Sequence, residues 1–495
     1  SSCSNVYETN AIKLHALINY LQDTLGNPPD LNKYPFSLSH GIEGYCIFIE
    51  TLIDKKKIEN DILPIFTEKQ LYDDLIASEN VIQSLSKRIP AISITASADI
   101  DSCIQELLAG KSLLTIAGIN EILIIDVAKF NHRPVSEPQT ETTVRGPREA
   151  FNEDFAINIG LLRKRIRSTK LHIEQMTIGT RTETRLLLAF MKDLAPSEVV
   201  NEFRRRIQLI QTDSLLDTTY VEEWIQDSTF SFFPTLLNTE RPDVTASHIL
   251  EGRVAVLVDG SPIAIIGPIT LFQYFSAPED YYQRANVATL LRWLRIWAFT
   301  LAVFVPALYI AVISYHQALI PPSLLINISA QREGVPFSGA LEAFIMMITF
   351  EILREAGLRM PRVAGQAISI VGALVLGQAA VQAGLVSAAM VIIVSITAIS
   401  NFVSPFYNFA ISQRLLQFSY MLLASFMGLF GILCGVLFTT VHLASLKSFG
   451  VPYLAPLAPT LLSDWKDTLI RVPRQWMTTF PRMNDIKYKK KGKLP

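Results

Sequence analysis

The stretch Leu415–Leu446 reads LLQFSYMLLASFMGLFGILCGVLFTTVHLASL and contains no charged residue. Two further uncharged stretches precede it, Ile296–Gln331 and Val363–Gln413, whereas the chain up to about Asp280 has the composition of a water-soluble protein. About eighteen consecutive apolar residues are enough to cross a hydrocarbon core of about 30 Å. We therefore expect a soluble head followed by a membrane domain built of helices.

Composition excludes several classes of protein. The 495 residues carry a net charge of −1, which gives no indication of nucleic-acid binding. The four cysteines and seven histidines show no metal-ligand spacing, and the sequence contains no GxGxxG, GxxxxGK[ST], HExxH or GxSxG motif. We expect no enzyme activity, no cofactor and no metal. No secretory signal is recognisable near Ser1, which favours a cytoplasmic head.

The head contains an internal repeat. Leu108–Gly118 (LAGKSLLTIAG) aligns with Leu250–Gly260 (LEGRVAVLVDG) at a spacing of 142 residues. The same spacing relates Asp101 to Asp243 and Phe48 to Phe190. Agreement at one offset over most of the head indicates a duplication.

Each repeat has the same expected elements. An amphipathic helix (Ile12–Leu25; Glu153–Arg167) precedes an apolar strand (Tyr45–Leu52; Arg185–Asp193). A β-hairpin closes each repeat, with strands Ser112–Ala117 and Ile122–Val127 in the first, and Val254–Val258 and Ile263–Gly267 in the second. The expected fold is an α/β head of two duplicated subdomains followed by an all-α polytopic membrane domain. The expected boundaries are residues 1–140, 141–283, 284–446 and a basic cytoplasmic tail at 447–495.

The membrane domain has four clear spans, at about Trp293–Tyr315, Val363–Gly384, Leu385–Phe406 and Leu415–His442. Arginines precede the first span and lysines follow the last, so both ends are expected in the cytoplasm. Val335–Gly357 is apolar but contains three glutamates, so it is expected either to lie in the interface or to be a span that faces a polar cavity. Four spans fit the charge pattern if this segment is interfacial or re-entrant, but Arg354, Arg359 and Arg362 then face outward. Five or six spans stay open, and five would put the lysine-rich tail outside.

Val363–Gly384 is rich in Gly and Ala but contains three glutamines. At helical spacing one stripe collects the pore-lining candidates: Ile368, Val371, Val375, Gln378 and Gln382. In a ring of subunits this stripe would form an apolar constriction with a polar mouth. The alternative is tight helix packing through the small residues, with the glutamines bonding across helices.

Charged residues near the membrane give two further sets of candidates. Glu342, Glu351 and Glu355 would attract cations if they formed a ring, but Glu355 is also spaced to pair with Arg359 on a helix. The segment where the head meets the first span is expected to couple the two parts. Its candidates are Tyr282, Arg284, Arg292 and Arg295.

Several motifs resemble one family. Arg145–Phe151 (RGPREAF), Thr239–Asp243 (TERPD) and Ser276–Tyr282 (SAPEDYY) in the head are similar to GerA-type spore germinant receptor A subunits. So are Arg332–Phe337 (REGVPF), Phe350–Gly357 (FEILREAG) and Ser448–Pro456 (SFGVPYLAP) in the membrane half. SpoVAF-like proteins share this architecture, and the resemblance covers roughly residues 10–460.

The resemblance implies a function. Such a subunit lies in the inner membrane of the bacterial spore as a multi-pass protein with cytoplasmic head and tail. It works with a transporter-like B subunit and a lipoprotein C subunit, and a homo-oligomeric ring in the lipid bilayer would form a nutrient-gated ion channel that triggers germination. The alternatives are a SpoVAF-type accessory protein that assists ion release and a non-conducting membrane scaffold.

Overall fold

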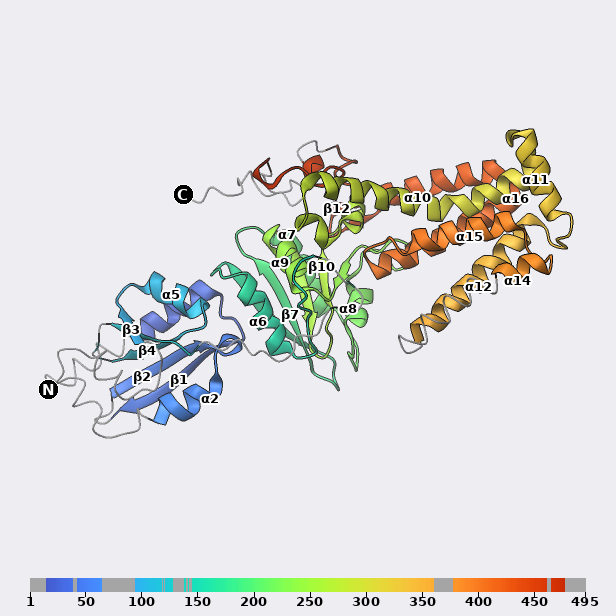
Figure 1. Ribbon diagram of the computed structural model, residues 1–495. Helices are drawn as coiled ribbons and strands as arrows, with labels where there is room; N and C mark the ends of the chain where they lie inside the picture. The colour runs from blue at the N-terminus through green and yellow to red at the C-terminus, as the bar shows by residue number, and fades with distance from the viewer. Residues whose placement is uncertain are drawn as a thin grey trace, which may run out of the picture.

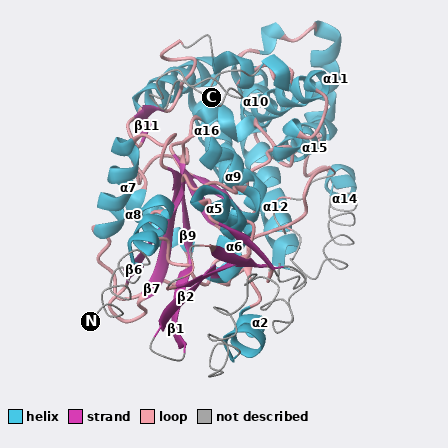
Figure 2. Cartoon of the chain, turned by 90° about the vertical axis from the view of Figure 1, so that its left-hand side faces the viewer, coloured by secondary structure: helices cyan, strands magenta, loops and turns pink. Residues whose placement is uncertain are grey.

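The chain is described by a computed structural model that covers residues 15–38, 42–64, 94–117, 119, 121–127, 138, 141, 145–359, 377–460 and 464–476. The first unit of the head lies at one end of the molecule, the second in the middle, and a bundle of helices extends from the second unit (Figure 1). Seen from the side of the head, the strands lie in front of the bundle helices (Figure 2).

The first unit is built on a five-stranded sheet. Its strands are β1 (Leu31–Leu38), β2 (Ile42–Ile49), β3 (Ile94–Ser97), β4 (Ser112–Ile116) and β5 (Ile122–Ile125), in the spatial order β1-β2-β4-β5-β3. All of these neighbours pair antiparallel. One face of the sheet packs against a helix at residues 15–25 and α5 (Ile100–Leu108), and α2 (Lys55–Lys57) lies nearby. Asp99 caps α5 by accepting from the amides of Asp101 and Ser102.

The second unit repeats this arrangement. Its strands are β6 (Leu171–Ile178), β7 (Thr184–Met191), β8 (Leu237–Thr239), β9 (Val254–Val258) and β10 (Ala264–Gly267), in the order β6-β7-β9-β10-β8. Helices α6 (Phe155–Arg165), α7 (Ser197–Gln208), α8 (Thr218–Ile225) and α9 (Pro242–Leu250) surround the sheet. β2 and β7, β4 and β9, and α5 and α9 each start 142 residues apart. The predicted duplication is therefore confirmed.

A buried ion pair fixes the two units to each other. Arg163 of α6 donates to both carboxylate oxygens of Asp30 at 2.6 and 2.7 Å, and Thr51 donates to the same carboxylate at 2.9 Å. A glycine at position 160 lets α6 approach closely, since an added Cβ would lie 3.0 Å from the Thr51 carbonyl oxygen.

The bundle contains α10 (Ala285–Tyr315), α11 (Pro322–Arg332), α12 (Gly339–Arg359), α14 (Gly377–Gln382), α15 (Ala388–Asn401) and α16 (Tyr407–Ser445). Among the described helices, α10 and α16 are long and apolar enough to cross a membrane. The head end of the bundle is where Phe409 stacks on Tyr274 of the head, with ring centroids 4.9 Å apart. The far end is where Tyr315, the last residue of α10, donates to the Ser425 carbonyl at 2.6 Å.

Helix α16 is folded back on itself, which corrects the single span expected at Leu415–His442. Tyr420 and Thr439 share a hydrogen bond of 2.9 Å, although 19 residues of straight helix would separate them by about 28 Å. The reversal occurs at Gly428, whose φ of 59° and ψ of −138° are not helical. The first arm of α16 therefore runs from the head end to the far end, and the second, antiparallel arm returns to the head end.

Helix α12 runs the length of the bundle, which favours a span over an interfacial or re-entrant segment at Val335–Gly357. Near its start, Glu342 binds Ser387 at the first turn of α15. Near its end, Glu351 pairs with Arg414, which lies in the head-end part of α16. Arg354 and Arg359 thus lie toward the head end. The chain is at the far end again by Gly384, where an added Cβ would lie 3.3 Å from the Gly334 carbonyl oxygen.

After the bundle, the chain returns to the second sheet. The short hairpin β11 (Lys447–Ser448) and β12 (Val451–Pro452) packs there, with Ser448 donating to the Thr235 carbonyl at 2.7 Å. Phe449 stacks on Phe203 of α7 at 3.8 Å. One continuous apolar core joins the second sheet, the bundle and the residues that flank this hairpin, Leu446 and Tyr453, so the second unit and the bundle pack as one body.

Candidate functional site

A buried charge cluster lies where the head ends and α10 begins. The 3₁₀ turn Pro278–Tyr281 holds Asp280, whose carboxylate accepts from the Ala277 amide at 3.2 Å. Arg295 donates to both oxygens of Asp280 at 2.8 and 2.9 Å and to the Phe275 carbonyl at 3.0 Å. Arg292, one turn earlier on α10, approaches the same carboxylate at 3.5 Å. Asp280 and Arg292 are fully buried.

The C-terminal segment completes this cluster. Arg292 donates to the carbonyls of Asp467 and Thr468 at 2.6 and 3.0 Å. The Tyr281 hydroxyl donates to the Asp467 carboxylate at 2.9 Å. Arg471 donates to the Gln283 carbonyl at 2.7 Å. Residues from the head, from α10 and from the C-terminal segment therefore share one set of polar contacts around the buried Asp280 and Arg292, which we call the junction cluster.

Three motifs of the head meet beside this cluster. Tyr282 donates to Asp243 at 2.6 Å, and Asp243 also pairs with the fully buried Arg241 at 2.8 Å. Arg241 continues to the Pro147 carbonyl at 2.8 Å. Gly146, with φ of 131°, lies so close to the Tyr282 ring that an added Cβ would be 2.7 Å from it. Burial and the hydrogen bond to Asp243 raise the pKa of Tyr282 to about 12, so its hydroxyl stays a donor.

The structure thus brings three of the four coupling candidates into the junction. Arg292 and Arg295 belong to the cluster, Tyr282 belongs to the adjoining network, and Arg284 is exposed at the start of α10. Sequence reasoning missed Asp280, Asp467 and Arg471. The position of Asp280 in the SAPEDYY motif was an available signal for the first. No local pattern links the other two to contacts more than 170 residues away.

The structure describes only two of the five pore-lining candidates. Ile368, Val371 and Val375 lie outside the described residues. Gln378 and Gln382 lie on the short helix α14, and both side chains are exposed on the single chain.

The three glutamates have local partners within the chain. The carboxylate of Glu342 is buried and accepts from the amide and the hydroxyl of Ser387, both at 2.6 Å. Ser387 in turn caps α15 by accepting from the Met390 amide. Glu351 pairs with Arg354 and, at 3.2 Å, with Arg414 of α16. The predicted pair between Glu355 and Arg359 is present at 2.8 Å and is exposed. Glu342 and Glu351 therefore hold helices together within one chain.

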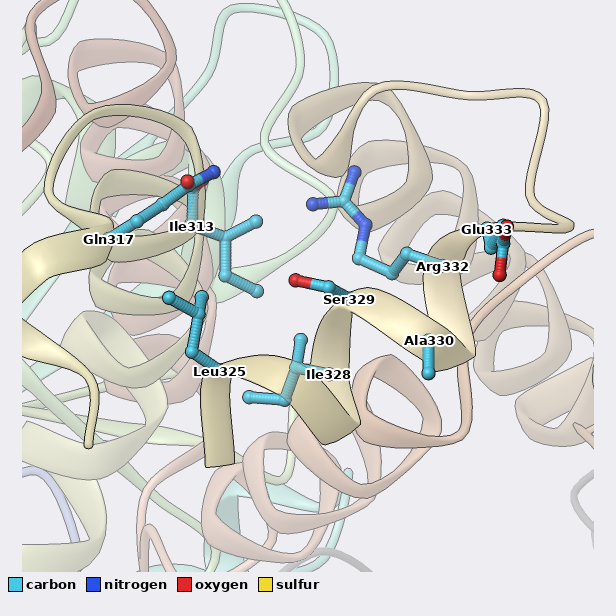
Figure 3. Close-up of a pocket in the computed structure, with 8 residues that line it drawn as sticks. All are labelled: Ile313, Gln317, Leu325, Ile328, Ser329, Ala330, Arg332 and Glu333. Atoms are coloured by element: carbon cyan, nitrogen blue, oxygen red, sulfur yellow. The ribbon is translucent and has the colours of Figure 1, made fainter. Parts of the chain in front are cut away.

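The far end of the bundle has an open pocket of about 570 Å³ between the end of α10 and α11 (Figure 3). Half of the residues that line it are apolar, and Arg332 and Ser329 point into it while Glu333 points away. The Arg332 side chain also lies 3.8 Å from Glu342. The residues that line the pocket are Ile313, Gln317, Leu325, Ile328, Ser329, Ala330, Arg332 and Glu333.

Comparison with known proteins gives consistent matches. Residues 19–483 match the family described as Bacillus/Clostridium GerA spore germination protein. Spore germination protein KA of Bacillus subtilis is 43% identical over 86% of this chain and 78% of its own length. Spore germination protein GerLA of Bacillus cereus is 37% identical over 94% of this chain and 95% of its own.

Among solved structures, the chain is similar to the N-terminal domain of the A subunit of the Bacillus megaterium spore germinant receptor GerK3. That similarity has a TM-score of 0.41 and 30% identity, and it covers 51% of this chain and 92% of the other. The family match extends over nearly the whole chain, through both units of the head and the bundle. This chain therefore belongs to the Bacillus/Clostridium GerA spore germination protein family.

Proposed function

We propose that this chain is the A subunit of a spore germinant receptor. It forms a homo-oligomeric ring in the inner membrane of the spore and acts with a transporter-like B subunit and a lipoprotein C subunit. When germinant binds, the ring opens a path for ions. Membership of the GerA family and the germination proteins among its relatives support the role in germination.

The junction cluster is the observation that carries the coupling part of this proposal. Asp280 of the head and Arg292 and Arg295 of α10 are buried together, so separating them would leave charges without partners. A rotation of the second unit must therefore move α10 with it. Since α10 packs along α16 and α15, that movement reaches the bundle.

The helix ends support six membrane crossings with head and tail in the cytoplasm. The proposed crossings are α10, α12, the span predicted from the sequence at Val363–Gly384, α15 and the two arms of α16. This count is even, and it places Arg354, Arg359 and Lys447 on the same side as the head. It removes the outward-facing arginines that four spans required and follows the excess of positive charge on the cytoplasmic side.

The pore in this proposal is lined by Ile368, Val371 and Val375, with Gln378 and Gln382 at its mouth. The exposure of both glutamines on the single chain supports this, since it leaves them free to face a lumen or a neighbouring subunit.

Ion flux tests the proposal directly. The full chain is reconstituted into liposomes loaded with K⁺, and efflux is measured for the parent protein and for Val371→Ser and Val375→Ser. A more polar constriction wets more easily, so both variants are expected to raise basal efflux. Leu433→Ser makes the same kind of change on an exposed face of α16 and is the matched control. An intact oligomer that conducts nothing in any variant would favour the non-conducting scaffold or the accessory role.

A further inference from the structure

A short loop of the second unit exposes aromatic side chains beside the bundle. Residues 226–233 read QDSTFSFF and connect α8 to the segment before β8. Phe230 is 97% exposed and Phe232 is 47% exposed. Exposed apolar side chains that cluster on one loop are typical of a surface that contacts a partner or a membrane. We call residues 226–233 the aromatic loop.

The aromatic loop is held against the head end of the bundle. Ser231, between the two exposed phenylalanines, shares a hydrogen bond of 2.9 Å with His442 in the last turn of α16. Asp227 accepts from the Phe449 amide at 2.7 Å, just after α16 ends. Asp227 also pairs with Arg206 at 2.7 Å, so its charge has a partner. The loop is therefore fixed at the level where the second arm of α16 leaves the bundle.

Other exposed residues mark the same level. Phe438 lies one turn deeper on α16, stacks on His442 and is 75% exposed. Trp293 and Trp297 are exposed on α10 within two turns of Phe299, and Phe299 stacks on Phe409. Lys447, directly after α16, is exposed as well. Aromatic rings together with lysines at helix ends are typical of the interface between hydrocarbon and headgroups.

We propose that the aromatic loop inserts Phe230 and Phe232 into the headgroup region of the bilayer and thereby anchors the second unit of the head to the membrane surface. This inference rests on the proposed membrane location of the bundle. A lipid surface fits better than a second copy of the chain because the exposed aromatics belong to three separate elements and share one level along the bundle. The anchor would fix the height of the second unit above the membrane.

The test uses the full chain in lipid nanodiscs, in a background of Cys3→Ser and Cys434→Ser, because Cys46 and Cys103 are buried. A polarity-sensitive fluorophore is attached through Phe230→Cys. Leu216→Cys is the matched control, since Leu216 is 65% exposed beside Asp217, which binds Ser261 at the opposite end of the second sheet. Phe438→Cys reports on the bundle itself. Nitroxides are placed either on the lipid headgroup or on the acyl chain.

The probe at position 230 is expected to shift its emission to the blue and to be quenched most by the headgroup nitroxide. The probe at 438 should respond most to the acyl-chain nitroxide, and the probe at 216 to neither. A blue shift at position 230 without quenching by either lipid nitroxide would show that the probe contacts protein. The absence of a blue shift would show that the probe is in water. Either result overturns the anchor. If position 438 is not quenched either, the membrane location fails together with the anchor.

Discussion

Gly428 allows the chain to reverse inside α16, and the residue type is required there. Its φ of 59° with ψ of −138° is open to glycine and strained for other residues. An added Cβ would also lie 3.0 Å from both Tyr315 and His316. We expect Gly428→Ala to lower the free energy of unfolding by about 1–3 kcal/mol, measured by thermal unfolding in detergent. Gly334→Ala, where nothing lies within 4 Å of an added Cβ, is the control and should change little.

Among the described carboxylates of the head, only that of Asp280 is approached by both Arg292 and Arg295. Asp280→Asn keeps the shape but leaves the two buried guanidinium groups without their shared negative charge. We expect a loss of about 3–5 kcal/mol in the free energy of unfolding. Glu355→Gln removes one partner of an exposed pair and should cost under about 1 kcal/mol. Equal unfolding temperatures for the two variants would show that the junction cluster does not hold the head to α10.

Glu141 makes the free energy of unfolding of the head depend on pH. Burial raises its pKa from an ordinary value of 4.5 to about 8, against the opposing hydrogen bond from Thr239 and the charge of Arg241. Between these values the folded chain retains a proton that the unfolded chain releases, so stability falls as pH rises from 4.5 to about 8. Glu141→Gln should reduce that fall in a series of unfolding curves. Glu153→Gln, at an exposed carboxylate, should leave the slope as it is.

At the scale of elements, the two arms of α16 predict an energetic coupling that a straight helix cannot show. Tyr420→Phe and Thr439→Val each remove one partner of the 2.9 Å hydrogen bond between the arms. In a double-mutant cycle we expect a coupling of about 0.5–1.5 kcal/mol. Ser419 and Thr440 each bond to the carbonyl four residues earlier on their own arm, so the same cycle on that pair should be additive.

Some elements could be predicted from the sequence and others could not. The duplication was predictable because the two hairpins repeat their turn-forming residues at one spacing, whereas β1 and β6 were missed. The residues of β1 are half-exposed or exposed and those of β6 alternate, so neither forms an apolar run. The reversal in α16 was missed because an uncharged stretch has the same composition whether it is straight or folded. The available signal was the three glycines Gly428, Gly431 and Gly435. A Cβ added at Gly431 would clash with the Leu423 carbonyl, and one added at Gly435 would clash with the Tyr420 ring.

The site divides in the same way. Arg292 and Arg295 could be predicted because arginines beside a long apolar stretch mark its boundary. Their partners Asp467 and Thr468 follow the bundle in the sequence and reach the junction only through the tertiary fold. The glutamates of α12 were ambiguous for the same reason. Their partners are distant in the sequence: Ser387, which donates to Glu342, lies 45 residues further along the chain. Arg414, which pairs with Glu351, lies 63 residues further along.

At the scale of the whole molecule, six crossings and four crossings place the same residues on different sides of the membrane. Six crossings put Glu355 on the side of the head, and they put Met427, beside the reversal at Gly428, at the opposite surface with Leu319. Four spans would place Met427 in the hydrocarbon and Glu355 on the outer side. All three side chains are exposed on the single chain, so each can carry a reporter cysteine without disturbing the core.

Labelling with a membrane-impermeant maleimide separates these topologies. In right-side-out vesicles, and in the background of Cys3→Ser and Cys434→Ser, we expect Leu319→Cys and Met427→Cys to react at once. Glu355→Cys should react only after the vesicles are permeabilised, because it lies on the side of the head. Protection of Met427→Cys under both conditions would restore the single final span. If Glu355→Cys still reacted only after permeabilisation, five crossings would remain, the head and the C-terminal segment would lie on opposite sides of the membrane, and the contacts of Asp467 and Arg471 with the junction could not form in the assembled protein.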